Sequence, residues 1–194
     1  MSETVQIKAP WLASKDPEVP STLNYSTLSM CGRVEEMVRQ YPNYIAYEFM
    51  GKTTTYAEMW QKINACAKSL KAIGIREGDK VTICMPNAPQ TLCMFYAVNM
   101  VGAIANMVHP LSAESEISFY LRDSNSVAAI TLDQFYDKFE HIRQNTGIIN
   151  IIIASVKDAL SRTIRAGYML TEGRKIQKIP EDAPVIRWKE FLHM

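Results

Sequence analysis

The feature that most constrains this chain is a repeated alternation of short apolar segments and segments with helical spacing. The apolar segments cover residues 80–85, 103–108, 127–131 and 148–153, and the connections between elements are short. Parallel strands must be joined by a crossover, which is usually a helix, so this alternation predicts a parallel sheet. We therefore expect the α/β class, with a mostly parallel sheet and helices on both of its faces.

Upstream of the first of these strands, the sequence predicts two helices and a hairpin. The first helix ends at Pro42, because proline cannot continue a helix. Residues 44–54 are rich in aromatic and β-branched residues and predict a hairpin or two strand fragments. Thr55 followed three residues later by Glu58 fits a capping box that starts the second helix, and Gly74 fits its C-terminal end.

Four further helices are expected between and after the strands, and the first of them is an apolar helix that ends at Val101. Ser112 and Asp133 are the predicted N-caps of two of them. Residues 156–170 fit an amphipathic helix, residues 172–184 an exposed connection, and residues 185–188 a short strand.

This organisation divides the chain into three parts. Residues 1–24 are expected to be a lead-in arm with little regular structure, anchored by Trp11. Residues 25–154 form the α/β domain. Residues 155–194 form a partial C-terminal extension that stops without an element of its own, so we expect the chain to be part of something longer.

Charge and cysteine content exclude several classes of function. The chain has 21 Lys and Arg against 20 Asp and Glu, a net charge of +1, so no nucleic-acid partner is expected. The four cysteines show no C-x-x-C spacing and no nearby histidine, so no metal site is expected. Buried free thiols and the absence of a secretory leader favour a cytoplasmic location.

Residues 86–113 contain no Asp, Glu, Lys or Arg, which raises the question of a membrane span. Asn99, Asn106 and His109 interrupt the segment, whereas a span needs about 20 predominantly apolar residues. We therefore expect a buried helix that leads into a buried strand, and no integral membrane segment. The methionines near this helix, such as Met94 and Met107, suit either the core or the lining for an acyl chain.

Known catalytic and phosphate-binding motifs are incomplete. Residues 74–80 approach a Walker loop, but the glycine spacing is short and the segment precedes a strand, so a helix-to-strand turn is expected. There is no G-x-G-x-x-G and no G-x-S-x-G. Asp133, Asp137 and Glu140 fit a solvated helical face. His109 stands at the carboxyl end of a strand, where α/β proteins bind ligands, although a turn histidine bonded to backbone remains open.

Five motifs taken together resemble the adenylate-forming enzymes, which include the acyl-CoA synthetases. The resemblance covers Ser26 to about Ile153. The matching segments, in chain order, are T-Y-A-E at 55–58, G-I-R-E-G-D-K-V at 74–81, M-P-N-A-P-Q at 85–90, G-A-I at 102–104 with H-P at 109–110 and E-I at 116–117, and L-R-D-S at 121–124. Gln90 departs from the acid that this family usually carries.

The resemblance implies that the chain is the N-terminal portion of a ligase. Such an enzyme activates a carboxylate with ATP, assisted by Mg²⁺, and transfers the acyl group to coenzyme A. The family's ATP-binding loop, T-S-G-T-T-G-x-P-K-G, is absent from this sequence, and the segment like residues 188–192 precedes that loop in the family. We therefore expect a chain that ends before the ATP site, has no catalytic residue, and holds none of these cofactors by itself.

The resemblance also implies a site region. In thioester-forming members, the loop that matches His109-Pro110-Leu111 lies near the docked coenzyme A nucleotide. Lys138 matches no family motif but supplies a cation in the same region, where a phosphate contact is expected.

The expected partners are the remainder of the same polypeptide and a small carboxylic acid, with self-association as a further possibility. The alternatives are a non-catalytic interaction module that kept the fold, whose exposed apolar patch would bind a partner, and an unrelated nucleotide-binding α/β protein.

Overall fold

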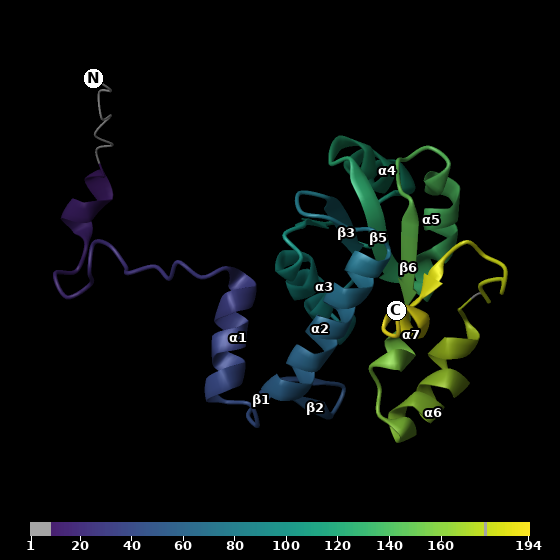
Figure 1. Ribbon diagram of the computed structural model, residues 1–194, viewed down its shortest axis with the longest axis horizontal. Coiled ribbons are helices and arrows are strands. Elements are labelled where there is room, and N and C mark those ends of the chain that lie inside the picture. The colour runs from purple at the N-terminus through teal and green to yellow at the C-terminus, as the bar shows by residue number, and fades with distance from the viewer. Residues whose placement is uncertain (1–8, 177) are drawn as a thin grey trace.

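A five-stranded parallel sheet forms the centre of the protein (Figure 1). The computed structural model describes residues 9–176 and 178–194. The strands lie in the spatial order β4-β3-β5-β6-β7, and every neighbouring pair is parallel. Their bounds are β3 (Lys80–Cys84), β4 (Ile104–Met107), β5 (Ser126–Leu132), β6 (Asn150–Ala154) and β7 (Ile186–Arg187). The predicted α/β class is confirmed.

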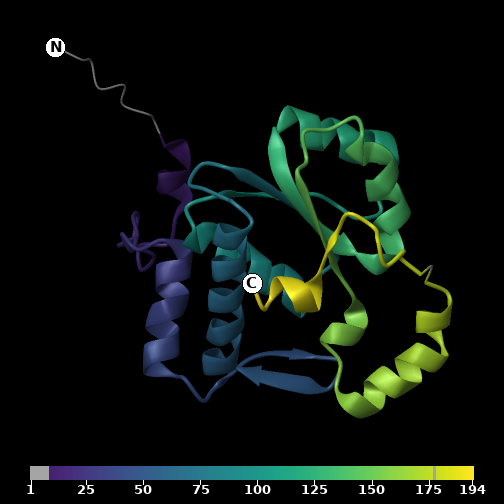
Figure 2. The same ribbon diagram turned by 45° about the vertical axis from the view of Figure 1, so that its right-hand side comes forward.

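Helices cover both faces of this sheet, as expected for parallel strands joined by crossovers. On one face, α2 (Tyr56–Ala72), α3 (Pro89–Met100) and α7 (Trp188–Phe191) enclose the larger apolar core. On the other face, α4 (Glu114–Asp123) and α5 (Tyr136–Arg143) enclose a second, smaller core. An outer helix, α1 (Met30–Gln40), lies beside α2 and contacts α2 and α3 (Figure 2).

The predicted capping chemistry upstream of the sheet is confirmed. The hairpin consists of β1 (Ile45–Phe49) and β2 (Lys52–Thr55), which pair antiparallel. The Thr55 hydroxyl accepts from the Glu58 N–H, and the Glu58 carboxylate accepts from the Thr55 N–H at 2.8 Å. Gly74 follows α2 with φ of +90°, a conformation that glycine adopts without strain.

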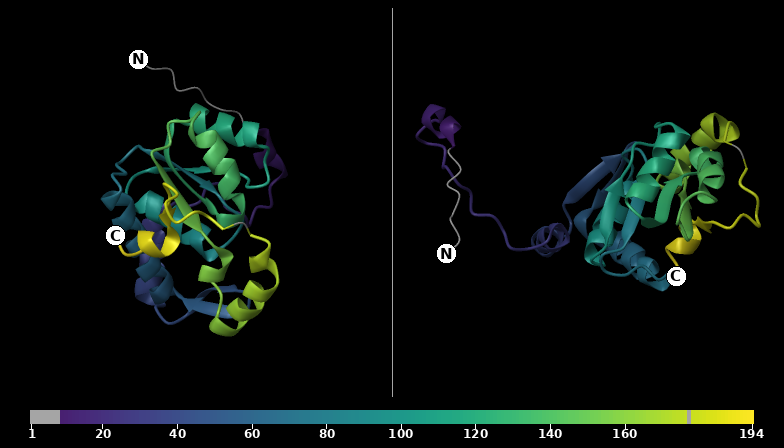
Figure 3. Two further views of the ribbon diagram at one scale, coloured as in Figure 1. Left: turned by 90° about the vertical axis from the view of Figure 1, so that its right-hand side faces the viewer. Right: turned by 90° about the horizontal axis from the view of Figure 1, so that it is seen from above.

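The described part of the arm lacks the anchor that was expected at Trp11. A short 3₁₀ helix, η1 (Pro10–Ser14), has no buried residue, and Trp11 is 65% exposed. From this helix the chain runs without regular structure to α1, well away from the sheet (Figures 1 and 3). The prediction that Trp11 anchors the arm is therefore wrong, because most of this residue is exposed to solvent. Residues 1–8 of the predicted arm lie outside the described residues.

Two predicted N-caps are shifted. α4 begins after Ala113, and not after Ser112, because the Glu116 carboxylate accepts from the Ala113 N–H at 3.0 Å. A 3₁₀ helix, η2 (Asp133–Phe135), precedes α5, so Asp133 does not cap the α-helix itself.

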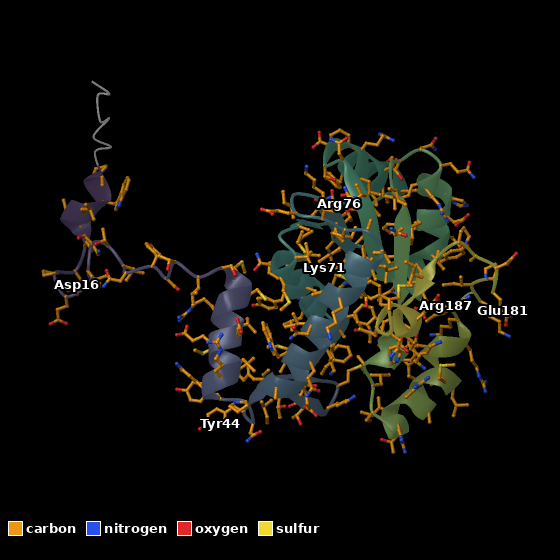
Figure 4. The ribbon with its side chains drawn as sticks, viewed as in Figure 1. Asp16, Tyr44, Lys71, Arg76, Glu181 and Arg187 are labelled. Atoms are coloured by element: carbon orange, nitrogen blue, oxygen red, sulfur yellow. The ribbon has the colours of Figure 1, made fainter. Side chains whose placement is uncertain are left out.

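The single helix expected over residues 156–170 is divided. The chain forms η3 (Val156–Asp158), then α6 (Arg162–Leu170), whose first turn the Ser161 hydroxyl caps, and then η4 (Glu172–Arg174). No residue of α6 is buried. Beyond it, the Arg187 guanidinium, which Figure 4 labels together with Glu181, donates to the Pro180 carbonyl at 2.8 Å. This bond ties the connection between α6 and β7 to β7 itself.

Candidate functional site

The order of the strands defines where a ligand can approach the sheet. The chain passes from β3 outward to β4 and then returns to form β5 on the other side of β3. In open α/β sheets, ligands bind outside the carboxyl ends of the strands at the point where the strand order reverses. The carboxyl ends of β3, β4 and β5, with the loops that follow them, therefore form the candidate site.

The structure brings Lys138 of α5 against the loop that follows β4. Its ammonium donates to the Ser112 carbonyl at 3.0 Å and to the Pro110 carbonyl at 3.5 Å. It also lies over the Phe135 ring, 5.6 Å from the ring centroid. The Lys138 side chain is half-buried, so these contacts fix a positive charge at the carboxyl edge of the sheet.

The thiol of Cys84, at the end of β3, lies in the field of the same ammonium. Burial raises the pKa of Cys84 to about 12, and the Lys138 charge opposes that rise without cancelling it. The neutral thiol is therefore the form present at physiological pH, and it is a poor nucleophile. Thr131 of β5 donates its hydroxyl to the Cys84 carbonyl at 3.0 Å, which joins the ends of the two central strands.

The other predicted site residues lie on the loop itself. The His109 Nδ1 accepts from the Leu111 N–H at 3.2 Å, so His109 is a turn histidine bonded to backbone. His109 is exposed, Pro110 is buried, and the Leu111 side chain is 72% exposed. The four predicted residues thus form one local group at the sheet edge. Their predicted contact with coenzyme A stays a prediction.

A buried polar contact that the sequence did not predict lies nearby. Gln90, in the first turn of α3, donates its amide N–H to the Ser155 carbonyl at 2.9 Å. Both side chains are buried, and within the described chain neither the Gln90 Oε1 nor the Ser155 Oγ has a hydrogen-bond partner. The departure of Gln90 from the family's usual acid was the one available signal. A neutral amide can donate to a carbonyl oxygen, which a carboxylate cannot do.

An open apolar groove of about 380 Å³ lies between the hairpin and α3. Its lining includes Phe49 of β1, Phe95 and Tyr96 of α3, and Met107 of β4. Met94, by contrast, is fully buried in the core. Met94 therefore belongs to the core, whereas Met107 lines the groove, and the acyl-chain role stays a prediction.

The acidic residues of this region do not form a metal centre. Asp133 lies on η2, and Asp137 and Glu140 lie on α5. Over residues 9–176 and 178–194, no group of three or more His, Cys, Asp or Glu side chains is arranged to hold a metal ion. Across the same residues, no helix combines the length and apolarity that crossing a bilayer requires.

The parallel sheet with helices on both faces defines an α/β protein, and comparison with known proteins identifies its family. Residues 34–184 match the family described as "AMP-binding enzyme". The match covers more than half of the chain, and the chain belongs to this family.

Curated relatives match at the level of sequence. The chain is 30% identical over 172 residues to the long-chain-fatty-acid–CoA ligase of Bacillus subtilis (strain 168), covering 89% of this chain and 31% of that protein. It is 27% identical over 157 residues to the long-chain-fatty-acid–CoA ligase of Escherichia coli O6:H1, covering 80% and 28%. The chain thus spans less than a third of the length of these relatives.

Solved structures share the fold. The anthranilate CoA ligase AuaEII in complex with anthranoyl-AMP superimposes with a TM-score of 0.68 at 18% identity, covering 84% of this chain and 27% of that one. Coronafacic acid ligase from Pectobacterium brasiliense superimposes with a TM-score of 0.69 at 16% identity, covering 86% and 30%. The resemblance to the N-terminal part of adenylate-forming enzymes is confirmed.

Proposed function

We propose that this chain serves as the N-terminal part of an ATP-dependent carboxylate–coenzyme A ligase. The family match and the curated relatives support the reaction class, and the relatives' names favour a fatty acid as the carboxylate. In this reaction ATP converts the carboxylate to an acyl-adenylate, and the coenzyme A thiol then displaces AMP. A cytoplasmic location and dependence on further segments of the polypeptide belong to the same proposal.

The observation that carries the proposal is the charge of Lys138 at the carboxyl edge of the sheet. Its ammonium has three N–H donors, and carbonyl oxygens of the His109–Ser112 loop accept two of them. The third donor and the full positive charge remain for an anionic group. A phosphate of the coenzyme A nucleotide is such a group, and ammonium–phosphate hydrogen bonds are among the stronger ones in proteins.

The residues of this chain fit only part of what the reaction needs. The sequence has no Ser/Thr/Gly-rich phosphate loop, and the described residues include no acidic cluster suited to Mg²⁺. ATP and Mg²⁺ therefore do not fit the side chains present here. We assign to this chain a binding role, in which Lys138 and its loop position the coenzyme A nucleotide, and no chemical step.

The test is a calorimetric titration of the purified chain with 3′-phosphoadenosine 5′-diphosphate, the nucleotide part of coenzyme A. We expect saturable binding that Lys138→Ala weakens by roughly tenfold or more, because a charge-assisted hydrogen bond contributes about 1.5–3 kcal/mol. Lys71→Ala is the charge-matched control. Lys71 is exposed on α2, in the helical layer on the opposite face of the sheet from α5, and Figure 4 labels it.

Two results would reject the proposal. One is the absence of saturable binding to the wild-type chain. The other is an equal loss of affinity in the Lys138→Ala and Lys71→Ala variants, which would indicate non-specific attraction. Turnover of ATP, fatty acid and coenzyme A by the purified chain alone would reject the purely binding role.

A further inference from the structure

The outer edge of β4 is one of the two edges of the parallel sheet, and its backbone hydrogen bonding is incomplete. Ile104 and Val108 donate their N–H groups to the Asp79 and Ile83 carbonyls, at 2.8 and 3.1 Å. Because backbone groups alternate in direction along a strand, the N–H and C=O groups of Ala105 and Met107 point away from β3. Across the described ranges, β4 pairs with β3 alone, and no turn or loop backbone bond reaches Ala105 or Met107.

Natural sheets usually protect such an edge. Charged side chains, proline, a bulge or a covering helix are the common devices, and they prevent pairing with another strand. β4 has none of the first three, since Ile104–Met107 reads I-A-N-M and pairs with β3 in regular register. The nearest charged residues in sequence are Lys80 and Glu114, because residues 81–113 contain no Asp, Glu, Lys or Arg.

The side chains of β4 are also exposed in a way that is unusual for a parallel strand. Ile104 and Met107 are each 52% exposed, whereas every residue of the central strand β5 except one is buried. Parallel sheets are normally covered on both faces along their whole width. An apolar, uncharged edge with free backbone groups fits one kind of partner, an extended strand with the same character.

We propose that this edge is the interface with a second copy of the chain, formed by antiparallel pairing of the two β4 strands about a two-fold axis. An interface of this kind places the same surface on both partners, so β4 must be complementary to itself. The proposal goes beyond the ligase function and does not depend on it.

The register of this pairing follows from the direction of the backbone groups. With the axis at Asn106, Ala105 of each copy lies opposite Met107 of the other, and both residues direct their N–H and C=O groups across the interface. This register pairs every free backbone group of Ala105 and Met107. Centring the axis on Ala105 instead would place Met107 opposite Ala103, whose N–H already donates to Val98.

The side chains fit the same register. On the face toward α3, the small Ala105 lies opposite the long Met107, so the two sizes complement each other. On the face toward α4, Ile104 lies opposite Val108, and Ile104 supplies most of the apolar surface of this pair because Val108 is buried. Neither face brings like charges together, because residues 81–113 carry none.

The first test measures the mass of the chain by light scattering after size-exclusion chromatography, over about two decades of concentration. We expect twice the mass of one chain, 22.0 kDa, at the higher concentrations. Met107→Lys should raise the dimer dissociation constant at least tenfold, because the substitution places a charge at two points of a symmetric interface. Phe119→Lys is the matched control, since Phe119 is 54% exposed and lies on α4, outside the β4 strand.

The second test fixes the register. Ala105→Cys and Met107→Cys variants, mixed and oxidised, should form a disulfide-linked pair of one copy of each variant. The four native cysteines are buried and do not compete.

A chain that is monomeric at every concentration would overturn the proposal. So would a dimer that Met107→Lys weakens no more than Phe119→Lys does, or one in which the mixed variants do not cross-link. If the chain is monomeric at every concentration, the partner of the β4 edge would instead be a strand from elsewhere in a longer polypeptide.

Discussion

Four small polar side chains hold the centre of the sheet to its β4 edge. The Thr82 hydroxyl lies 2.7 Å from the Ser126 hydroxyl and accepts from the Asn106 amide at 2.9 Å. Ser124 closes the group, with its hydroxyl 2.8 Å from that of Ser126 and 3.0 Å from the Asn106 nitrogen. We expect Thr82→Val, which keeps the shape of the side chain and removes the hydroxyl, to lower the free energy of unfolding.

The magnitude follows from the bonds that are lost. Thr82 is completely buried, and the substitution removes two hydrogen bonds at about 1 kcal/mol each. Both partners keep a bond to Ser124, so neither pays the full penalty of an unsatisfied buried group. The expected loss is about 2 kcal/mol, or roughly 4–8 °C in Tm for a chain of this size.

Urea unfolding followed by circular dichroism measures this loss. Thr53→Val is the control, because Thr53 is exposed on the hairpin and its substitution should change the free energy of unfolding by less than about 0.5 kcal/mol. Combining Thr82→Val with Ser126→Ala should cost about 1 kcal/mol less than the sum of the single changes, since both remove the same bond. Equal effects of Thr82→Val and Thr53→Val, or strict additivity, would refute the assignment of a coupled network.

Three further outcomes test other parts of the structure. Burial raises the pKa of Asp158 above its unfolded value, so ionisation of this carboxyl group opposes folding. Asp158→Asn should therefore raise the Tm at pH 7. This gain in Tm should vanish as the pH falls below the pKa of an unfolded aspartate, where the carboxyl group is protonated in both states. Gly74→Ala should lower the free energy of unfolding by about 1 kcal/mol, because φ at Gly74 is +90°. Gly147→Ala, at a position without positive φ, should not lower it. Equal effects of the two substitutions in urea unfolding would contradict this explanation. The thiols should resist a colorimetric thiol reagent at pH 8 until urea unfolds the chain. The reason is that burial raises the pKa of Cys84 to about 12 and of Cys93 to about 11. Rapid labelling of the native protein would contradict this prediction, because it would show that the thiols are accessible.

Most of the fold was predictable because most strands and helices carry a local signal. The Thr55 capping box and the apolar strands encode their structure within a few residues, and these predictions are confirmed. The arm and the extension were less predictable. Whether Trp11 is anchored depends on surfaces far away in the sequence, and the break before α6 depends on Ser161 as a cap inside an otherwise helical pattern.

The candidate site was predictable in its location and not in its contacts. The position of His109 after a strand indicated the carboxyl edge, and the family resemblance drew attention to Lys138. The bond from Lys138 to the Ser112 carbonyl joins residues 26 positions apart, and the bond from Gln90 to Ser155 joins residues 65 apart. Such contacts arise from the packing of whole elements, for which a single sequence carries no periodic signal.

The insertion of β5 beside β3 has a consequence for the chain while it is being synthesised. β3 and β4 can pair as soon as Met107 has left the ribosome, but the inner edge of β3 has no neighbour until Ser126–Leu132 has emerged. At about 5–20 residues per second, the 25 positions from Met107 to Leu132 take about 1–5 s. During that interval the nascent β3–β4 pair presents two open edges, and a chaperone that binds apolar strands has its best opportunity to act on it.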